Sequence, residues 1–222
     1  IQNEICSVVV DGFGDRSTTS ISLVNNHHNI VELWSCPYPF SIGLFYSAIT
    51  DFLGFQVNEG EYKVMGLSSF GNENSEIAIK VSKLIRWDND KKKIIQDMSF
   101  FNYHVDPEIS FSQKLVNYLG NPRNPFKQLL PDDDDFQYYA DIAKGAQLAV
   151  VQILRSIFCY AHELTKCNDF LFSGGVAMNS ASLDQLASLD FVKNIFIPPS
   201  PGDSGSAIGV AYYSFLKNNV EK

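Results

Sequence analysis

The feature that most constrains the fold is a helical pattern that runs from about Tyr138 to Thr165. Small and apolar side chains recur there every three or four residues, at Tyr139, Ala143, Ala146, Val150, Ile153, Ile157, Ala161 and Leu164. This spacing places them on one face of a helix, and such a stripe is buried against other elements. The pattern therefore predicts a long helix with a buried face.

Strand-like segments precede and follow this helix. β-branched, apolar runs at 5–10, 18–24 and 30–34 are separated by short turns, which predicts a meander of three strands. After the long helix we expect a strand, a Gly turn, a helix, a strand, a rigid loop and a closing helix, at 169–172, 174–175, 179–187, 194–197, 198–203 and 204–216. This order predicts a mixed α/β layer structure.

The middle of the chain is expected to be less regular. We predict a helix over 42–54, a short helix or turn within 59–71, a helix over 76–86, a hairpin over 92–103 and a loop-rich stretch over 111–135. Residues 73–136 are predicted to be a peripheral insertion, and residues 1–222 a single lobe.

Composition excludes several functional classes. The net charge is −8 and no basic stripe occurs, so nucleic-acid backbone is not expected to be a main partner. No apolar run approaches the roughly 20 residues of a membrane span. The four cysteines form no Cys-x-x-Cys pair, which favours reduced thiols. We therefore expect a cytoplasmic protein that binds neither nucleic acid nor membrane.

The first candidate site is the turn from Asp11 to Asp15, which follows the first predicted strand. Gly12 and Gly14 allow a close approach of the backbone to a phosphate, and Asp11 at the strand end suits a cation. An ordinary hairpin turn has the same composition, so both interpretations stay open at this point.

The second candidate is the loop from Ser173 to Asn179. A predicted strand runs into Gly174 and Gly175 and then into a helix, so helix N–H groups face the loop, an arrangement that suits phosphate or ribose. A tight strand–helix connector would also use glycines. The segment lacks the Lys-Ser/Thr of a P-loop and the G-x-G-x-x-G spacing of a dinucleotide-binding turn.

The third candidate is Asp203, in a proline-rich loop after the last predicted strand. It is either the N-cap of the closing helix or a positioned carboxylate. Because strands of one open sheet present their ends at a common edge, Asp11 and Asp203 are expected to meet across one cleft. Two such carboxylates are typical of a metal or nucleotide site.

Other candidates carry less information. Lys63 lies between Gly60 and Gly66 and suits either a phosphate contact or a surface lysine with a buried stem. His27 and His28 occupy an Asn-rich turn and are expected to be solvated, because adjacent residues at a strand end point in opposite directions. The acidic run 132–135 is expected to be a solvated loop. No Ser-His-Asp or Cys-His set is recognisable.

Five segments in order carry a resemblance to a known family. They are the turn at 11–15 with Thr18 and Thr19, the helix at 41–55, the run at 60–68, the loop at 173–179 and the loop at 199–209. Together they resemble the O-carbamoyltransferases that include nodulation-factor and antibiotic-tailoring enzymes, in the second half of their N-terminal actin-like ATP-binding domain. Ser68 departs from the alanine of the family's pattern.

The resemblance implies an actin-like ATPase fold (ribonuclease H-like, ASKHA), whose mixed sheet begins with a β-meander and is flanked by helices. It implies that carbamoyl phosphate and ATP form a carbamoyl adenylate, and that the carbamoyl group passes to a hydroxyl of a small-molecule acceptor. The carried-over nucleotide positions are Gly12, Gly14, Gly174, Gly175 and Asn179, with Lys63 from its motif alone. Asp11 and Asp203 are carried over as ligands of a divalent metal, which would be iron, manganese or zinc.

The departures from the family's pattern limit this expectation. The family's His-x-x-x-His metal pair should precede the strand that ends at Asp11, and the chain does not contain it. The first lobe and the C-terminal domain are also expected to be missing, so we expect an inactive fragment of a larger carbamoyltransferase. Two alternatives remain: a threonylcarbamoyl-transfer protein of tRNA modification, disfavoured by the acidic balance, and a non-catalytic interaction module, disfavoured by the intact Asp11 and Asp203.

Overall fold

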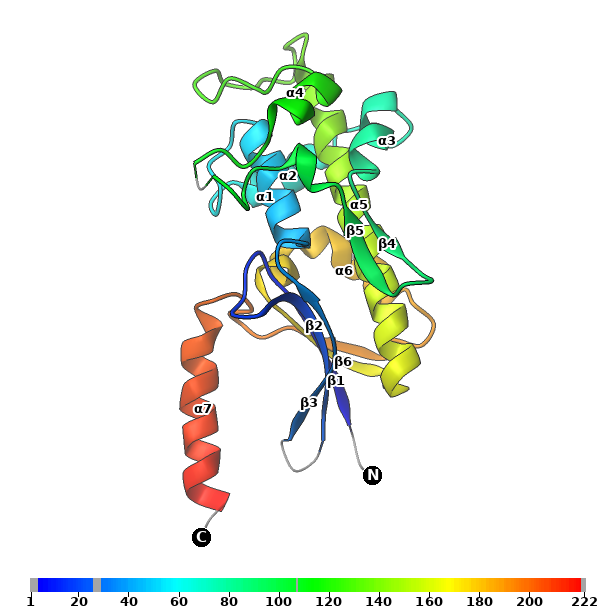
Figure 1. The fold of residues 1–222 in the computed structure, drawn as a ribbon, viewed down its shortest axis with the longest axis vertical. Helices are drawn as coiled ribbons and strands as arrows, with labels where there is room; N and C mark the ends of the chain where they lie inside the picture. Colours follow the sequence, from blue (N-terminus) through cyan, green and yellow to red (C-terminus); the bar gives the residue numbers. More distant parts are fainter. Residues whose placement is uncertain (1–3, 26–28, 107, 221–222) are drawn as a thin grey trace.

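A five-stranded mixed sheet forms one half of the molecule (Figure 1). The structure is a computed structural model, and it describes residues 4–25, 29–106 and 108–220. The strand order is β3-β2-β1-β6-β7, formed by Ile30–Pro37, Ser17–Val24, Ile5–Val10, Asp169–Ser173 and Asn194–Phe196. The predicted meander and the mixed α/β class are thus confirmed.

The pairing within the sheet decides where its loops lie. β1 pairs antiparallel with β2, from Ile5 opposite Val24 to Val10 opposite Thr19. β1 and β6 are parallel, with Val9 opposite Ser173, and β7 continues the sheet parallel to β6. The chain therefore leaves β1, β6 and β7 at the same edge, the edge at which open α/β sheets place ligands.

The predicted long helix is α5, which spans Phe136–Thr165. Its buried residues include all the predicted stripe positions except Leu164, which lies in the last turn and is 40% exposed. α5 is long and apolar enough to cross a membrane by length and composition alone, but 61% of its most apolar window is buried inside the protein. Packing in the core therefore accounts for its apolar surface.

Shorter elements surround α5 and the loops. The α-helices are α1 (Ile42–Phe52), α2 (Glu61–Ser68), α3 (Glu76–Ser82), α4 (Gln113–Leu119), α6 (Leu183–Ala187) and α7 (Gly205–Val220). Single 3-10 turns are η1 (Met98–Phe100), η2 (Gly175–Met178) and η3 (Ser180–Ser182), and β4 (Ile85–Asp88) pairs antiparallel with β5 (Lys93–Gln96).

Two predicted helices are shorter than the sequence pattern indicates. The helix predicted over 76–86 ends at Ser82, because the following residues form β4, in which Trp87 is opposite Ile94. The helix predicted over 179–187 begins as two 3-10 turns, and only Leu183–Ala187 is α-helical. In both cases pairing or turn geometry overrides a helical spacing of apolar side chains.

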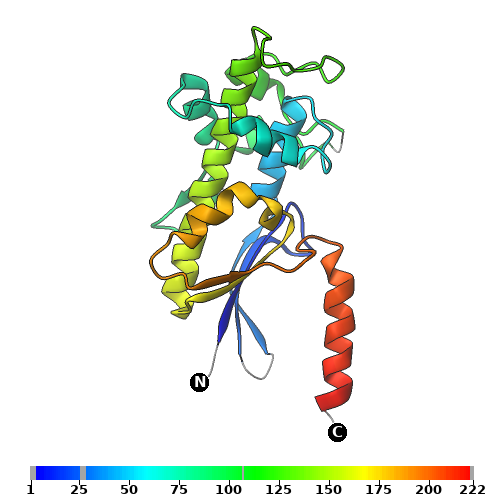
Figure 2. The same ribbon diagram turned by 180° about the vertical axis from the view of Figure 1, so that it is seen from behind.

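The segment 73–136 lies along α5 and beyond the sheet, as both ribbon views show (Figures 1 and 2). Its side chains nevertheless join the same core as the sheet, at Val81, Leu84, Ile85, Ile94, Phe101, Leu115 and Leu119. α7 projects from the loop after β7 on the far side of the sheet from α5. Several of its large apolar side chains are exposed, among them Tyr212 and Tyr213.

Candidate functional site

The candidate site is built on the three loops that leave β1, β6 and β7. Asp11 directly follows β1, Gly174 directly follows β6, and the proline-rich loop 197–204 follows β7. Close contacts join the first loop to the second and the second loop to the third. The structure therefore brings together the regions of Asp11, Gly174 and Asp203 that the sequence places far apart.

Asp11 is held with its carboxylate facing the second loop. Its backbone N–H donates to the carbonyl of Thr18 at 2.8 Å, and its Oδ1 accepts from the N–H of Gly12 at 2.7 Å. A Cβ added to Gly175 would lie 3.1 Å from the same Oδ1. The Asp11 carboxylate and the Gly174-Gly175 turn therefore share one narrow space.

The N-terminus of α1 packs against the Asp11 turn. A Cβ added to Gly43 would lie 2.6 Å from the backbone nitrogen of Gly12, so the helix approaches the turn as closely as backbone allows. Ser41 caps α1 by accepting from the N–H of Leu44 at 3.0 Å, and it donates to the carbonyl of Gly12 at 2.7 Å. Ser41 is fully buried, and its hydroxyl ties the helix cap to the loop.

Gly174 is the most constrained residue of the site. Its φ is +91°, and an added Cβ would overlap the carbonyl oxygen of Val10. Its N–H donates to the carbonyl of Pro201 at 2.7 Å, which joins the loop after β6 to the loop after β7. The same two loops also approach each other at Gly202, where an added Cβ would lie 3.8 Å from the Cα of Gly175.

Asn179 ends the second loop and is held by side chains that the sequence interpretation missed. Its side-chain amide forms two hydrogen bonds with that of Gln147 on α5, at 2.9 and 3.0 Å. The hydroxyl of Tyr46 on α1 donates to Oε1 of Gln147 at 3.0 Å. The available signal was Gln147 itself, a polar residue next to the predicted buried stripe of α5.

Asp203 differs from Asp11 in being exposed. Its backbone carbonyl accepts from the N–H of Ser206 at 3.1 Å and from its hydroxyl at 2.5 Å. Among the described residues, its carboxylate forms no hydrogen bond or ion pair and caps no N–H of α7. The side chain is therefore free for a ligand at the point where the third loop approaches the second.

Histidines add little to this site within the described ranges. His27 and His28 lie outside the described residues. His162 bonds the carbonyl of Cys167 through Nδ1 at 2.8 Å and stacks on Phe191 with ring centroids 4.3 Å apart, so its role is structural. The described part of the chain contains no group of three or more His, Cys, Asp or Glu that could hold a metal. Asp11 and Asp203 would thus be a partial ligand set.

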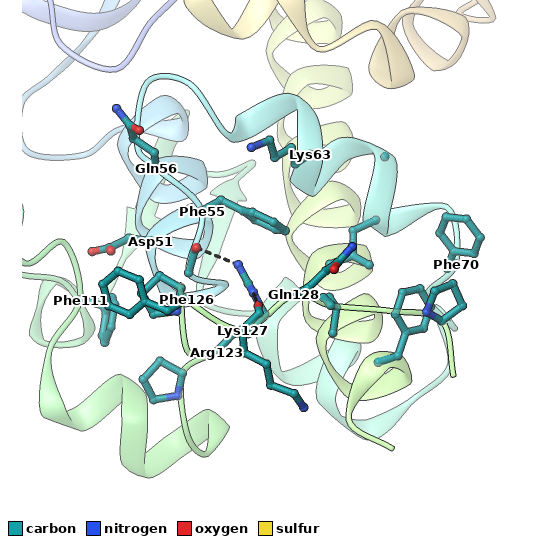
Figure 3. A pocket seen from close by; sticks show the side chains of 18 residues that line it. Asp51, Phe55, Gln56, Lys63, Phe70, Phe111, Arg123, Phe126, Lys127 and Gln128 are labelled. Carbon is teal, nitrogen blue, oxygen red and sulfur yellow. Dashed lines mark hydrogen bonds between the residues drawn. The ribbon is translucent and has the colours of Figure 1, made fainter. Parts of the chain in front are cut away.

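Lys63 lines a cavity that no residue of the three loops lines. It lines a cavity of about 1230 Å³ at the end of α1, together with Phe55, Phe111, Arg123 and Phe126 (Figure 3). Its Nζ is 5.9 Å from the centroid of the Phe55 ring, and the guanidinium of Arg123 is 4.6 Å from the same centroid. On the opposite side of α2, Sδ of Met65 is 3.7 Å from Oγ of Ser180, beside the second loop.

The geometry defines an α/β lobe with glycine-rich, strand-end loops and two carboxylates, and comparison with known proteins places it in a family. Residues 2–212 match the family described as carbamoyltransferase N-terminus, and the chain belongs to that family. The resemblance found in its motifs is thereby confirmed.

Several curated proteins are similar to nearly the whole chain. An uncharacterised protein of Synechocystis is 30% identical over 219 residues, which are 97% of this chain and 34% of that protein. Nodulation protein NolNO of Sinorhizobium fredii is 25% identical over 92% of this chain and 27% of its own length. Nodulation protein NolO of Bradyrhizobium diazoefficiens is 26% identical over 91% and 33%. The chain thus spans about a third of the length of these relatives.

Proposed function

We propose that this chain is the nucleotide- and metal-contacting lobe of an actin-like (ASKHA) O-carbamoyltransferase. The complete enzyme would form carbamoyl adenylate from carbamoyl phosphate and ATP, and pass the carbamoyl group to a hydroxyl of a small-molecule acceptor. Membership of the carbamoyltransferase N-terminus family supports the reaction class. The observation that carries the site assignment is the approach of the Asp11 carboxylate to Gly175, with Gly202 next to them.

The nucleotide would lie along the first and second loops. Gly12, Gly14, Gly174 and Gly175 leave backbone without side chains there, so phosphate oxygens can approach N–H groups closely. Asn179 adds an amide that both donates and accepts, which suits a ribose hydroxyl or a phosphate. Lys63 remains a weaker candidate, because it lines the separate aromatic cavity.

A divalent metal would be held by Asp11 and Asp203, with its remaining ligands from outside the described residues. The residues fit this role: one carboxylate is oriented by the Gly12 N–H, and the other is exposed and unbonded in the described structure. Iron, manganese and zinc all accept carboxylate together with imidazole ligands. When bound, the metal would act as a Lewis acid and offset phosphate charge.

In the transfer step the acceptor oxygen would bond to the carbamoyl carbon while the bond from that carbon to the adenylate oxygen breaks. AMP would leave with the bridging oxygen, and the hydroxyl proton would pass to a base or to water. The residues of this chain would bind and orient the nucleotide. Backbone N–H groups would hold the phosphate, and the Asn179 amide would hold a ribose hydroxyl or a second phosphate. Such preorganised donors stabilise charge that develops during acyl transfer.

The test is calorimetric titration of the full chain with ATP and with Mn²⁺, compared between wild type and Asp203→Asn. Because Asp203 is exposed and its carboxylate forms no recorded bond within the described residues, the variant should fold normally. We expect it to lose about tenfold or more in Mn²⁺ affinity, since removing even an outer-shell partner of a metal costs that much.

The matched control is Asp184→Asn, which changes an exposed aspartate on α6. Absence of ATP binding in the wild type would overturn the nucleotide assignment, and an unchanged Mn²⁺ affinity in Asp203→Asn would overturn the metal assignment.

A further inference from the structure

Three buried or half-buried polar side chains meet beneath the second loop. They come from separate elements: Tyr46 from α1, Gln147 from α5, and Asn179 from the loop after β6. The amides of Gln147 and Asn179 form a closed ring of two hydrogen bonds. Nε2 of Gln147 donates to Oδ1 of Asn179 at 2.9 Å, and Nδ2 of Asn179 donates back to Oε1 of Gln147 at 3.0 Å.

Such a ring does not by itself fix which way round the two amides lie. Turning both amides over exchanges their oxygens and nitrogens and leaves two equally good hydrogen bonds. Tyr46 favours one of the two arrangements, because its hydroxyl donates to Oε1 of Gln147 at 3.0 Å. After the flip it would face Nε2 instead, and its buried proton would have no hydrogen-bond acceptor among the described residues. Burial raises the pKa of Tyr46, so the phenol keeps its proton and stays a donor.

The surroundings leave these groups few alternative partners. Gln147 is 7% exposed and Tyr46 is 6% exposed, so an unpaired amide here would lose its hydrogen bonds to water without replacement. Asn179 is only half-buried. After pairing with Gln147, it keeps one N–H and one oxygen lone pair that this pair does not use.

We propose that Tyr46 and Gln147 are positioning residues that hold the amide of Asn179 in one orientation, so that a defined N–H and a defined lone pair face the nucleotide. This inference rests on the proposed function for its ligand, but the orientation of Asn179 does not depend on it. A preoriented amide has less freedom to lose on binding. If only a fraction of molecules holds the competent orientation, the apparent dissociation constant rises by the inverse of that fraction.

The main variant is Gln147→Met, which keeps the length of the side chain and removes its amide. We expect ATP affinity to fall about fivefold to tenfold, because the competent orientation of Asn179 is then a minor one. Tyr46→Phe should cost only about twofold, since it makes two orientations of the paired amides equally populated. Gln152→Met, an exposed position five residues further along α5, is the matched control and should leave affinity unchanged.

A double-mutant comparison separates positioning from a general effect on folding. In an Asn179→Ala background, Gln147→Met should have no further effect on ATP affinity, because no amide remains to be oriented. A ligand-independent readout is hydrogen exchange of the Asn179 side-chain NH₂ group, followed by NMR. One N–H should exchange slowly in the wild type, and this protection should be lost in Gln147→Met.

The outcomes distinguish this inference from the proposed function. The inference is overturned if Gln147→Met leaves the exchange of the Asn179 amide unchanged, or if it weakens ATP binding equally with and without Asn179. If the wild type binds no ATP, the proposed function fails, and the exchange measurement alone decides whether Tyr46 and Gln147 orient Asn179. A wild type that binds ATP with the expected pattern of losses supports both.

Discussion

The strand-end loops are held in place mainly by contacts between backbone atoms, whereas the segment 73–136 depends largely on side-chain contacts. In the loops, backbone touches backbone: Gly174 lies against the carbonyl of Val10 and donates to that of Pro201, and Gly43 lies against Gly12. In the segment 73–136, side chains add many attachments to backbone contacts such as the bond from the Arg123 N–H to the Phe52 carbonyl at 3.0 Å. The guanidinium of Arg123 donates to four backbone carbonyls: those of Leu53, Gly54, Asn124 and Lys127.

The difference predicts how each region responds to substitution. A backbone–backbone approach leaves no room for a methyl group and has no flexible part to yield, whereas side-chain attachments lose their bonds one at a time. Gly174 and Gly43 should therefore tolerate almost no change, while the segment 73–136 should lose stability in graded steps. The rigidity lies where we place the nucleotide, which fits a site that must be formed before its ligand arrives.

The largest effect is expected for Gly174→Ala. The added Cβ would overlap the Val10 carbonyl at a φ of +91°, so either the strand end or the loop must move. We expect a loss of about 3 kcal/mol or more in the free energy of unfolding, and a fall of several degrees in Tm. Chemical denaturation and thermal melting measure both.

The matched control for Gly174→Ala is Gly209→Ala in α7, where an added Cβ meets nothing within 4 Å. This variant should be neutral or stabilising by up to about 1 kcal/mol, because alanine favours helix over glycine. Equal effects at the two glycines would contradict the view that the loop after β6 is fixed by its backbone.

An intermediate effect is expected for Arg123→Met, which keeps an apolar stem and removes the donors. Arg123 is 8% exposed, and burial lowers its pKa, so its carbonyl partners replace water. Losing these bonds should cost about 2–3 kcal/mol of unfolding free energy, measured by urea denaturation. Arg86→Met, at an exposed arginine of β4, should cost much less.

Arg123→Met should also leave ATP affinity within about twofold of the wild type, which is a change of about 0.4 kcal/mol in binding free energy. A tenfold loss would instead mean that the segment 73–136 takes part in the nucleotide site. The comparison between the two regions would then have to be abandoned.

The sequence predicted the loops better than the segment, for a physical reason. Strand, glycine pair and helix follow one another locally at 169–187, so Gly174 and Gly175 could be placed at a strand end from neighbouring residues alone. The hydrogen bond from Arg123 to the Leu53 carbonyl joins positions about 70 residues apart, and no local sequence pattern indicates it. Gln147 is similar: its partners are 101 and 32 residues away, and only its polarity beside a buried stripe marks it.

The smallest effect concerns the exposed ion pair between Asp97 and Lys114, 2.8 Å apart, in the segment 73–136. Hydrogen bonds from Lys114 and Ser99 lower the pKa of Asp97 to about 2, below its unfolded value of about 4. A lowered folded pKa stabilises the protein above the unfolded value, and this contribution is lost as pH falls from about 4 to about 2. Because both side chains are at least half exposed, we expect the ion pair to contribute less than about 1 kcal/mol to the free energy of unfolding, and salt should reduce this further.

The free energies of unfolding of wild type and Asp97→Asn should therefore differ slightly at pH 6 and converge near pH 2, with Asp134→Asn as the exposed control. A difference that persists at pH 2 would show that Asp97 acts through its shape and not its charge, and the graded, side-chain character of this segment would then rest on packing instead of electrostatics.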